Sequence, residues 1–190
     1  MKYFKPFILA VIMLLGISTD VSAQQHLKFM GIPMNMSIDA FQKRLAAKGI
    51  YKDKSVSSVL PYGSRMFNGL FAGYRCSIMV YYNQSKTVYR SAVIYRNEDE
   101  ELSDGFYQNI KELLQTKYSE EEQKTTTNDG YEAFNVDVTD DTGEYSIGSI
   151  QLYKTVHTFE WDDDPTYIIF VDYIDSANSA DYNQDLLDDM

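Results

Sequence analysis

Two short amphipathic segments, each followed by a run of strand-like sequence, constrain the fold of this chain more than any other feature. Apolar residues recur at helical spacing over 38–48 and again over 104–118. Ser37 is placed to cap the first of these helices, and Ser103 or Asp104 the second. We expect both apolar stripes to face the core, which predicts that four side chains are buried: Phe41, Leu45, Ile110 and Leu114.

The segments between and after the helices alternate in the manner of strands. The clearest example is 74–82, where every second residue is apolar or aromatic. The other expected strands are 66–72, 87–96, 131–138, 144–161 and 166–175. The resulting order is helix, three strands, helix, and three or four strands, which predicts an α+β fold with antiparallel sheet. Internal duplication of one helix-plus-sheet unit is one interpretation of this order.

The first 23 residues have the layout of a secretory signal peptide. A short basic start is followed by an apolar run and by the small residues Val21-Ser22-Ala23. The run is too short to span a bilayer, and no cysteine near the cut offers a site for lipid attachment. We therefore expect a soluble exported protein, periplasmic or extracellular and not a lipoprotein. Residues 24–175 are expected to form one α+β domain, followed by an acidic, partly disordered tail over 176–190.

Charge divides the expected domain into two unlike halves. Residues 24–97 hold 11 lysines and arginines and two acidic residues, a net charge of +9, whereas 98–190 hold four lysines and 25 acidic residues, a net charge of −21. The acidic total argues against nucleic acid and anionic membranes as partners. The asymmetry suggests that 24–97 and 98–175 complement each other electrostatically.

Three consecutive carboxylates, Asp162–Asp164, beside the single tryptophan raise the question of a metal site. An EF-hand loop beginning at Asp162 would need an acid at its fifth position and glycine at its sixth, where Thr166 and Tyr167 stand. We interpret 162–166 as a hairpin turn initiated by Asp164 and Pro165. Asp162 and Asp164 stay weak candidates for a surface calcium site, and no cofactor is expected.

The sequence offers little for catalysis. It contains no HExxH, GxSxG, CxxC or Walker A pattern. Cys76 and His157 lie in strand-like sequence, where packing explains them, and His26 falls near the new N-terminus. A hydrolase acting on glycan or peptide through two carboxylates is the alternative, although no spacing singles out a pair.

Tyrosine is the abundant residue type, with 16 in the chain. Tyrosine suits half-buried sheet surfaces and also supplies rigid, amphipathic contact area for binding. Tyr81 is expected to point away from the apolar face of its strand. We therefore predict a non-catalytic binding protein of the cell envelope whose partner is an unknown protein or glycan. The candidate binding residues are Tyr81, Tyr89, Tyr95 and Trp161.

Three stretches carry a resemblance: HLKFMGIPMNMSIDAFQKRLAAKG, FNGLFAGYRCSIMVYY and IIFVDYIDSANS. Together they resemble small exported proteins of Bacteroides-like bacteria, a group that implies no catalytic residues. The helix-plus-sheet order is also similar to the repeat of beta-lactamase-inhibitor-type proteins, an analogy of fold alone. The bacterial resemblance further implies that Asp175-Ser176-Ala177 could accept an O-linked glycan on Ser176.

Overall fold

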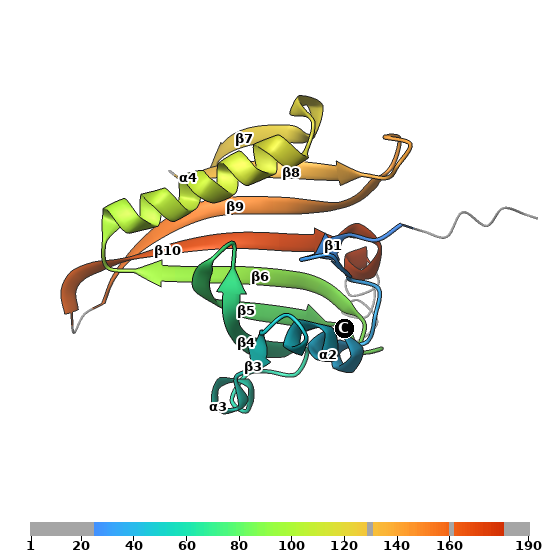
Figure 1. The fold of residues 1–190 in the computed structure, drawn as a ribbon, viewed down its shortest axis with the longest axis horizontal. Coiled ribbons are helices and arrows are strands. Elements are labelled where there is room, and N and C mark those ends of the chain that lie inside the picture. The colour runs from blue at the N-terminus through green and yellow to red at the C-terminus, as the bar shows by residue number, and fades with distance from the viewer. Residues whose placement is uncertain (1–24, 129–130, 160–161, 181–190) are drawn as a thin grey trace, which may run out of the picture.

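A computed structural model describes residues 25–128, 131–159 and 162–180. They form an α+β fold built on one eight-stranded antiparallel sheet, which confirms the predicted fold class (Figure 1). The strands are β3 (Tyr51–Lys52), β4 (Ser64–Phe71), β5 (Tyr74–Tyr82), β6 (Val88–Asn97), β7 (Gln123–Asn128), β8 (Tyr131–Thr139), β9 (Ser146–Phe159) and β10 (Asp162–Asp175). A separate hairpin pairs β1 (Lys28–Phe29) with β2 (Ile32–Pro33).

The strand order is β3-β4-β5-β6-β10-β9-β8-β7. Each half of the sheet is therefore an antiparallel meander, and the last strand of one half pairs with the last strand of the other. A helix precedes each meander: α2 (Ile38–Ala46) the first and α4 (Glu100–Lys117) the second. This arrangement is what duplication of one unit would produce, and the duplication itself stays a prediction.

Both main helices cover the same face of the sheet, toward the viewer in Figure 1. Their apolar residues join alternate strand residues and the β1–β2 hairpin in a single core cluster. The four side chains predicted to be inside are all buried, with Phe41 and Leu45 fully so. The short helix α3 (Lys54–Ser57) and the 3₁₀ turn η1 (Glu120–Glu122) lie outside this core, since neither contains a buried residue.

The first helix ends as its sequence predicts. Ser37 caps it by accepting a hydrogen bond from the backbone N–H of Ala40. At the other end Gly49 adopts a left-handed φ of 78°, which glycine accommodates without steric cost. The N–H of Ile50 then donates to the carbonyl of Leu45 at 3.0 Å, and Ile50 folds into the core. This is a Schellman motif with its apolar contact.

The start of the second helix departs from the prediction. Asp99 is the N-cap residue, and its carboxylate accepts a hydrogen bond from the N–H of Leu102 at 3.0 Å. Ser103, one of the two expected caps, lies inside the helix and is fully buried. The earlier start adds one turn, whose Glu100 and Glu101 favour the positive end of the helix dipole.

The polar segment after α4 forms regular structure that the sequence pattern does not indicate. Residues 120–122 form η1, and 123–128 form β7, an edge strand paired only with β8. Glu122 links η1 to the end of β8, because its carboxylate accepts hydrogen bonds from the backbone N–H and the hydroxyl of both Ser119 and Thr139. The β-branched threonines of β7 suit a strand although the segment has no apolar alternation.

The acidic run does not form the hairpin turn predicted for 162–166. Asp162 already pairs with Phe159, so β10 begins there, and the connection at 160–161 lies outside the described residues. The next aligned pair is Thr166 with His157, which leaves three residues of β10 opposite one of β9. Pro165 lies in this irregularity, where its missing N–H interrupts no ladder hydrogen bond.

The predicted tail begins with ordered structure. Residues 176–180 are helical, and Asn178 is buried, with its side-chain amide donating to the carbonyls of Met34 and Val88. Asp175 is also fully buried and accepts hydrogen bonds from the N–H groups of Leu27 and Asn178. These contacts join the N-terminal segment to the end of the sheet. Residues 181–190 lie outside the described part of the chain.

Candidate functional site

The face of the sheet opposite α2 and α4 carries neither of these helices, and the short helix α3 meets it only at β4, where its N-cap Asp53 accepts a hydrogen bond from the Asn68 amide. We call this surface the open face. It consists of the strand residues that alternate with those of the core cluster. Its central members are Met66, Met79, Tyr81, Arg90, Ala92, Ile94, Tyr153, Ile168, Phe170, Asp172 and Ile174. Ile94 and Ile168 are more than nine-tenths buried yet do not belong to the core cluster, because they lie on the other side of the sheet.

An ion pair lies at the centre of the open face. The guanidinium of Arg90 donates from Nε to Asp172 Oδ1 at 2.8 Å and from its second nitrogen to Oδ2. Asp172 is only 2% exposed. Its hydrogen bonds and charge raise the pKa of Arg90 and outweigh the opposing effect of burial. A bidentate pair of this kind fixes the orientation of both side chains.

Aromatic rings surround this pair. The Arg90 guanidinium lies 4.9 Å from the ring centre of Tyr81, a cation–π distance. The rings of Tyr153 and Phe170, on neighbouring strands, stack with centroids 4.9 Å apart. Burial raises the pKa of the Tyr153 hydroxyl, and the charge of Asp172 adds to the effect. The open face therefore combines half-buried apolar area with a fixed charge pair.

The structure separates the four tyrosine and tryptophan candidates. Tyr81 lies on the open face, as predicted, and contacts Tyr89, the extra residue of a β-bulge in β6. Tyr95 lies on the core face instead, where its ring stacks on Phe106 at 4.4 Å. The side chain of Tyr95 points to the opposite side of the sheet from that of Tyr81, so Tyr95 belongs to the core packing and not to the open face. Trp161 lies outside the described residues.

Sequence reasoning missed the pair at the centre of the site. Two signals could have pointed to it: Asp172 interrupts the apolar strand IIFVDYI, and Arg90 interrupts TVYRSAVIY. A charged residue within an otherwise apolar strand needs a partner when it is buried. The identity of that partner depends on which strands pair, and β6 and β10 are far apart in sequence.

The structure describes the side chain of one of the two metal candidates. Asp164 is exposed near the start of β10, and the side chain of Asp162 lies outside the description. Among the described residues, no group of three histidine, cysteine, aspartate or glutamate side chains could hold a metal ion.

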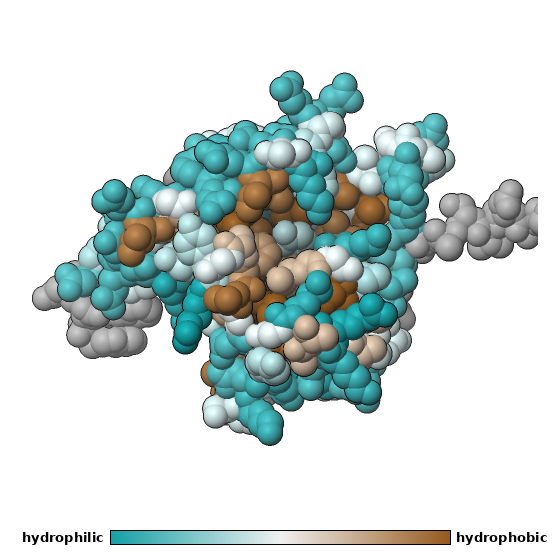
Figure 2. Space-filling model, in the orientation of Figure 1, coloured by the Kyte–Doolittle hydropathy of each residue, from teal (hydrophilic) through white to brown (hydrophobic). Residues whose placement is uncertain are grey.

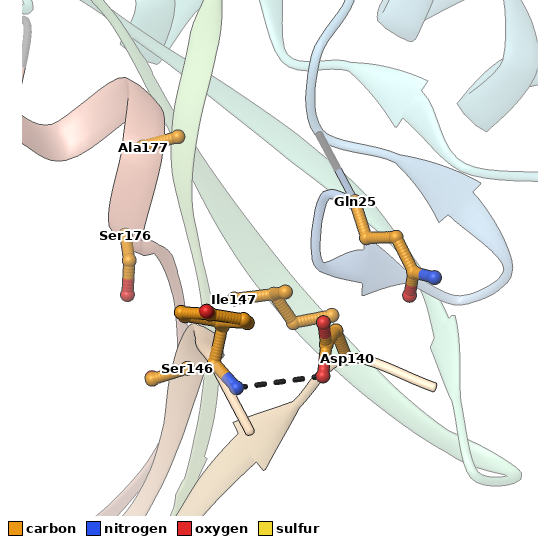
Figure 3. A pocket seen from close by; sticks show the side chains of 7 residues that line it. Gln25, Asp140, Ser146, Ile147, Ser176 and Ala177 are labelled. Carbon is orange, nitrogen blue, oxygen red and sulfur yellow. Dashed lines mark hydrogen bonds between the residues drawn. The ribbon is translucent and has the colours of Figure 1, made fainter. Parts of the chain in front are cut away.

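A cavity of about 470 Å³ lies at the end of the sheet where the N-terminal segment, the β8–β9 loop and the helical turn 176–180 meet. Figure 3 shows Gln25, Asp140 and Ser176 around it. Ser176, the predicted glycan acceptor, is exposed and begins the helical turn. Asp140 is the one carboxylate among the described lining residues. A hydrogen bond from the hydroxyl of Thr142 lowers its pKa, which is opposite to the shift that a general acid requires.

The helix-bearing face carries an apolar groove of about 320 Å³ between α4 and the turns of the β1–β2 and β4–β5 hairpins. Figure 2 shows apolar atoms gathered in this region. Leu113, which the sequence places on the apolar side of α4, lines the groove and is 52% exposed. None of the described residues that line this groove carries a carboxylate.

Comparison with known proteins adds no family. No protein-family model, no curated protein and no solved structure matches this chain. No helix in the described part of the chain is long and apolar enough to cross a membrane. The fold and the site together define an α+β protein whose two main helices cover one sheet face and leave the other to aromatic residues around an arginine–aspartate pair.

Proposed function

We propose that this chain is an exported binding protein that engages a partner protein through the open face. The observation that carries the proposal is the composition of that face: apolar and aromatic side chains surround the Arg90–Asp172 pair, in which the aspartate is buried and the arginine half-exposed. Tyrosine, arginine and methionine are enriched in protein interfaces, and the binding energy concentrates on buried aromatic and arginine residues.

A protein fits this surface better than a glycan does. The open face extends across the central strands as a continuous sheet surface, and stable protein interfaces need about 800 Å² from each partner. A sugar would be expected to lie on exposed aromatic rings within a groove. Here the rings of Tyr153 and Phe170 stack on each other and are half-buried. The predicted signal peptide adds the cellular context, which places the partner in the envelope space or outside the cell.

The hydrolase alternative has less support. Counting only the described residues, Asp140 is the single carboxylate that lines any of the three cavities. Glu100 and Asp104 do lie together, but both bind the ammonium of Lys154 as exposed ion pairs.

Site-specific photo-crosslinking in the native host would test this function. A photoreactive phenylalanine analogue replaces Tyr81 or Tyr153 on the open face, or Leu113 on the helix-bearing face as a matched control. We expect the two open-face positions to cross-link to the same protein and the Leu113 position not to do so. Cross-links from Leu113 alone, cross-links only to glycan, or no cross-link from either open-face position would contradict the proposal.

A further inference from the structure

The sheet divides at one place on the open face. The ladder between β5 and β6 ends at the pair Ser77–Ile94. Each strand nevertheless continues with its outer neighbour: β5 pairs with β4 as far as Tyr74, and β6 pairs with β10 as far as Asn97. The two strands therefore separate beyond Ser77–Ile94. A pocket of about 370 Å³ lies at this division, and we call it the seam pocket. Its lining residues are Asn68, Arg75, Cys76, Ser77, Ile94 and Arg96.

Two unpaired guanidinium groups line the seam pocket. Arg75 and Arg96 are both exposed, and within the described ranges neither makes a hydrogen bond or ion pair. The other two sheet arginines differ: Arg65 binds Asp39, and Arg90 binds Asp172. Two like charges at one pocket oppose each other unless an anion lies between them.

The other polar lining groups bond mainly to one another. Ser77 donates its hydroxyl to Asn68 Oδ1 at 3.0 Å, so the two guanidinium groups are the donors left to bind an anion. Asp53 is the one carboxylate bonded to this group, and it is already engaged by the Asn68 amide and by the N–H of Val56. Burial raises the pKa of the Cys76 thiol to about 12, so this side chain stays neutral and adds no negative charge.

The far side of the division is closed. On the core face an aromatic cluster fills the space between the separated strands: Tyr74 contacts Phe106 at 5.0 Å, and Tyr95 stacks on Phe106 at 4.4 Å. The seam pocket therefore has a packed floor and opens onto the open face. It is also continuous with the rest of that face, because Ile94 pairs with Phe170 across β6 and β10.

We infer that the seam pocket binds a carboxylate side chain from an acidic segment of the partner protein. This inference rests on the proposed function and names the chemistry of one contact within it. Guanidinium groups form two parallel hydrogen bonds with a carboxylate, and arginine is therefore preferred over lysine at such sites. Charge complementarity points the same way locally: the whole chain carries a net charge of −11, but the half that builds the pocket carries +9.

Titration with short peptides tests this inference without the partner. The full chain, labelled with nitrogen-15, is titrated with hexaglutamate, with hexaglutamine and with inorganic phosphate. The readout is the set of arginine Nε–H signals in the NMR spectrum. We expect hexaglutamate to shift the signals of Arg75 and Arg96, to leave that of Arg44 on α2 unchanged, and hexaglutamine to shift none. Arg75→Gln and Arg96→Gln should each weaken hexaglutamate binding about tenfold or more, while Arg44→Gln should not.

Three outcomes would overturn the inference: no shift at Arg75 and Arg96, equal shifts at Arg44, or saturation by phosphate at lower concentration than by hexaglutamate. Both pocket arginines are exposed, so the glutamine variants should keep the wild-type unfolding temperature, which verifies that lost binding is not lost folding. The titration needs no partner, so it can succeed when photo-crosslinking fails. Cross-links from the open face without a response of the pocket arginines would instead overturn the carboxylate contact and leave the proposed function in place.

Discussion

Replacing Asp175 with alanine should destabilise the protein more than its position at the end of the last strand would suggest. The carboxylate is fully buried and accepts hydrogen bonds from the N–H of Leu27 at 2.9 Å and from that of Asn178 at 3.0 Å. It also lies 3.2 Å from the Nδ1 atom of His26. The alanine variant would leave two buried N–H groups without an acceptor.

The magnitude follows from those two orphaned donors. Each buried N–H that loses its partner costs about 1–3 kcal/mol, so we expect the free energy of unfolding to fall by about 3–5 kcal/mol. For a urea slope of ~2 kcal/mol/M, this lowers the unfolding midpoint by about 1.5–2.5 M. Asp175→Asn keeps one acceptor oxygen and nearly the same shape, and it should cost less than the alanine variant.

Urea unfolding followed by circular dichroism measures this loss, and amide hydrogen exchange locates it. We expect Leu27 and Asn178 to lose protection in Asp175→Ala. The matched control is Asp137→Ala, an exposed carboxylate on β8, which should change the free energy of unfolding by less than about 0.5 kcal/mol. A midpoint for Asp175→Ala equal to that of the control would refute the assignment of Asp175 as the acceptor that joins the segment at Leu27 to the end of the sheet.

Three other substitutions test the core packing, the Arg90–Asp172 ion pair and the hydrogen bonds of Glu122. Leu45→Ala should lower the free energy of unfolding in urea by ~2–5 kcal/mol because the side chain is fully buried. Leu113 is half-exposed, so Leu113→Ala should lower it by under ~1 kcal/mol. Equal losses would mean that the helix faces are misassigned. Arg90→Met should destabilise the protein by ~2–3 kcal/mol, which is less than the ~3–5 kcal/mol for breaking a fully buried pair because the arginine is 37% exposed. Adding Asp172→Leu should restore most of the lost stability. A double variant that is no more stable than Arg90→Met would contradict this expectation. Burial by itself raises the pKa of Glu122, but the hydrogen bonds that its carboxylate accepts lower this pKa by more. The pKa of Glu122 therefore lies below its ordinary value. The stability that ionised Glu122 contributes is therefore present above the unfolded-state pKa and is lost as the pH falls through the folded-state pKa. Glu122→Gln should reduce the loss of stability on acidification from about pH 5 to about pH 3. An unchanged profile of stability against pH would count against this role of Glu122.

The elements that could be predicted are those whose determinants lie close together in the sequence. The first helix has its cap, its apolar stripe and its C-terminal glycine within 15 residues, and all three act as expected. Strand β5 alternates without interruption. By contrast β7 carries its threonines on both faces of an edge strand, so no apolar pattern announces it. The β1–β2 hairpin is too short for any periodicity, although Phe29 and Ile32 are core residues.

The candidate site was less predictable, because it depends on strand register. Tyr81 was correctly placed away from the core from the alternation of its own strand. Tyr95 was misplaced because a face can be assigned only relative to the neighbouring strand, and the bulge at Tyr89 shifts the parity within β6. The Arg90–Asp172 contact joins strands that are 82 residues apart, and no local pattern encodes that pairing.

The charge asymmetry of the chain bears directly on how the open face can work. If the basic and acidic halves mainly neutralised each other, many ion pairs would cross between them. Among the described residues, two contacts between a basic and an acidic side chain cross from one half to the other. One is the Arg90–Asp172 ion pair, and the other is the contact between His26 and Asp175. The remaining ion pairs form within a half. Most of the basic charge of the first half is therefore not used inside the molecule. It is available at the surface, and on the open face it is concentrated at the pocket where the sheet divides.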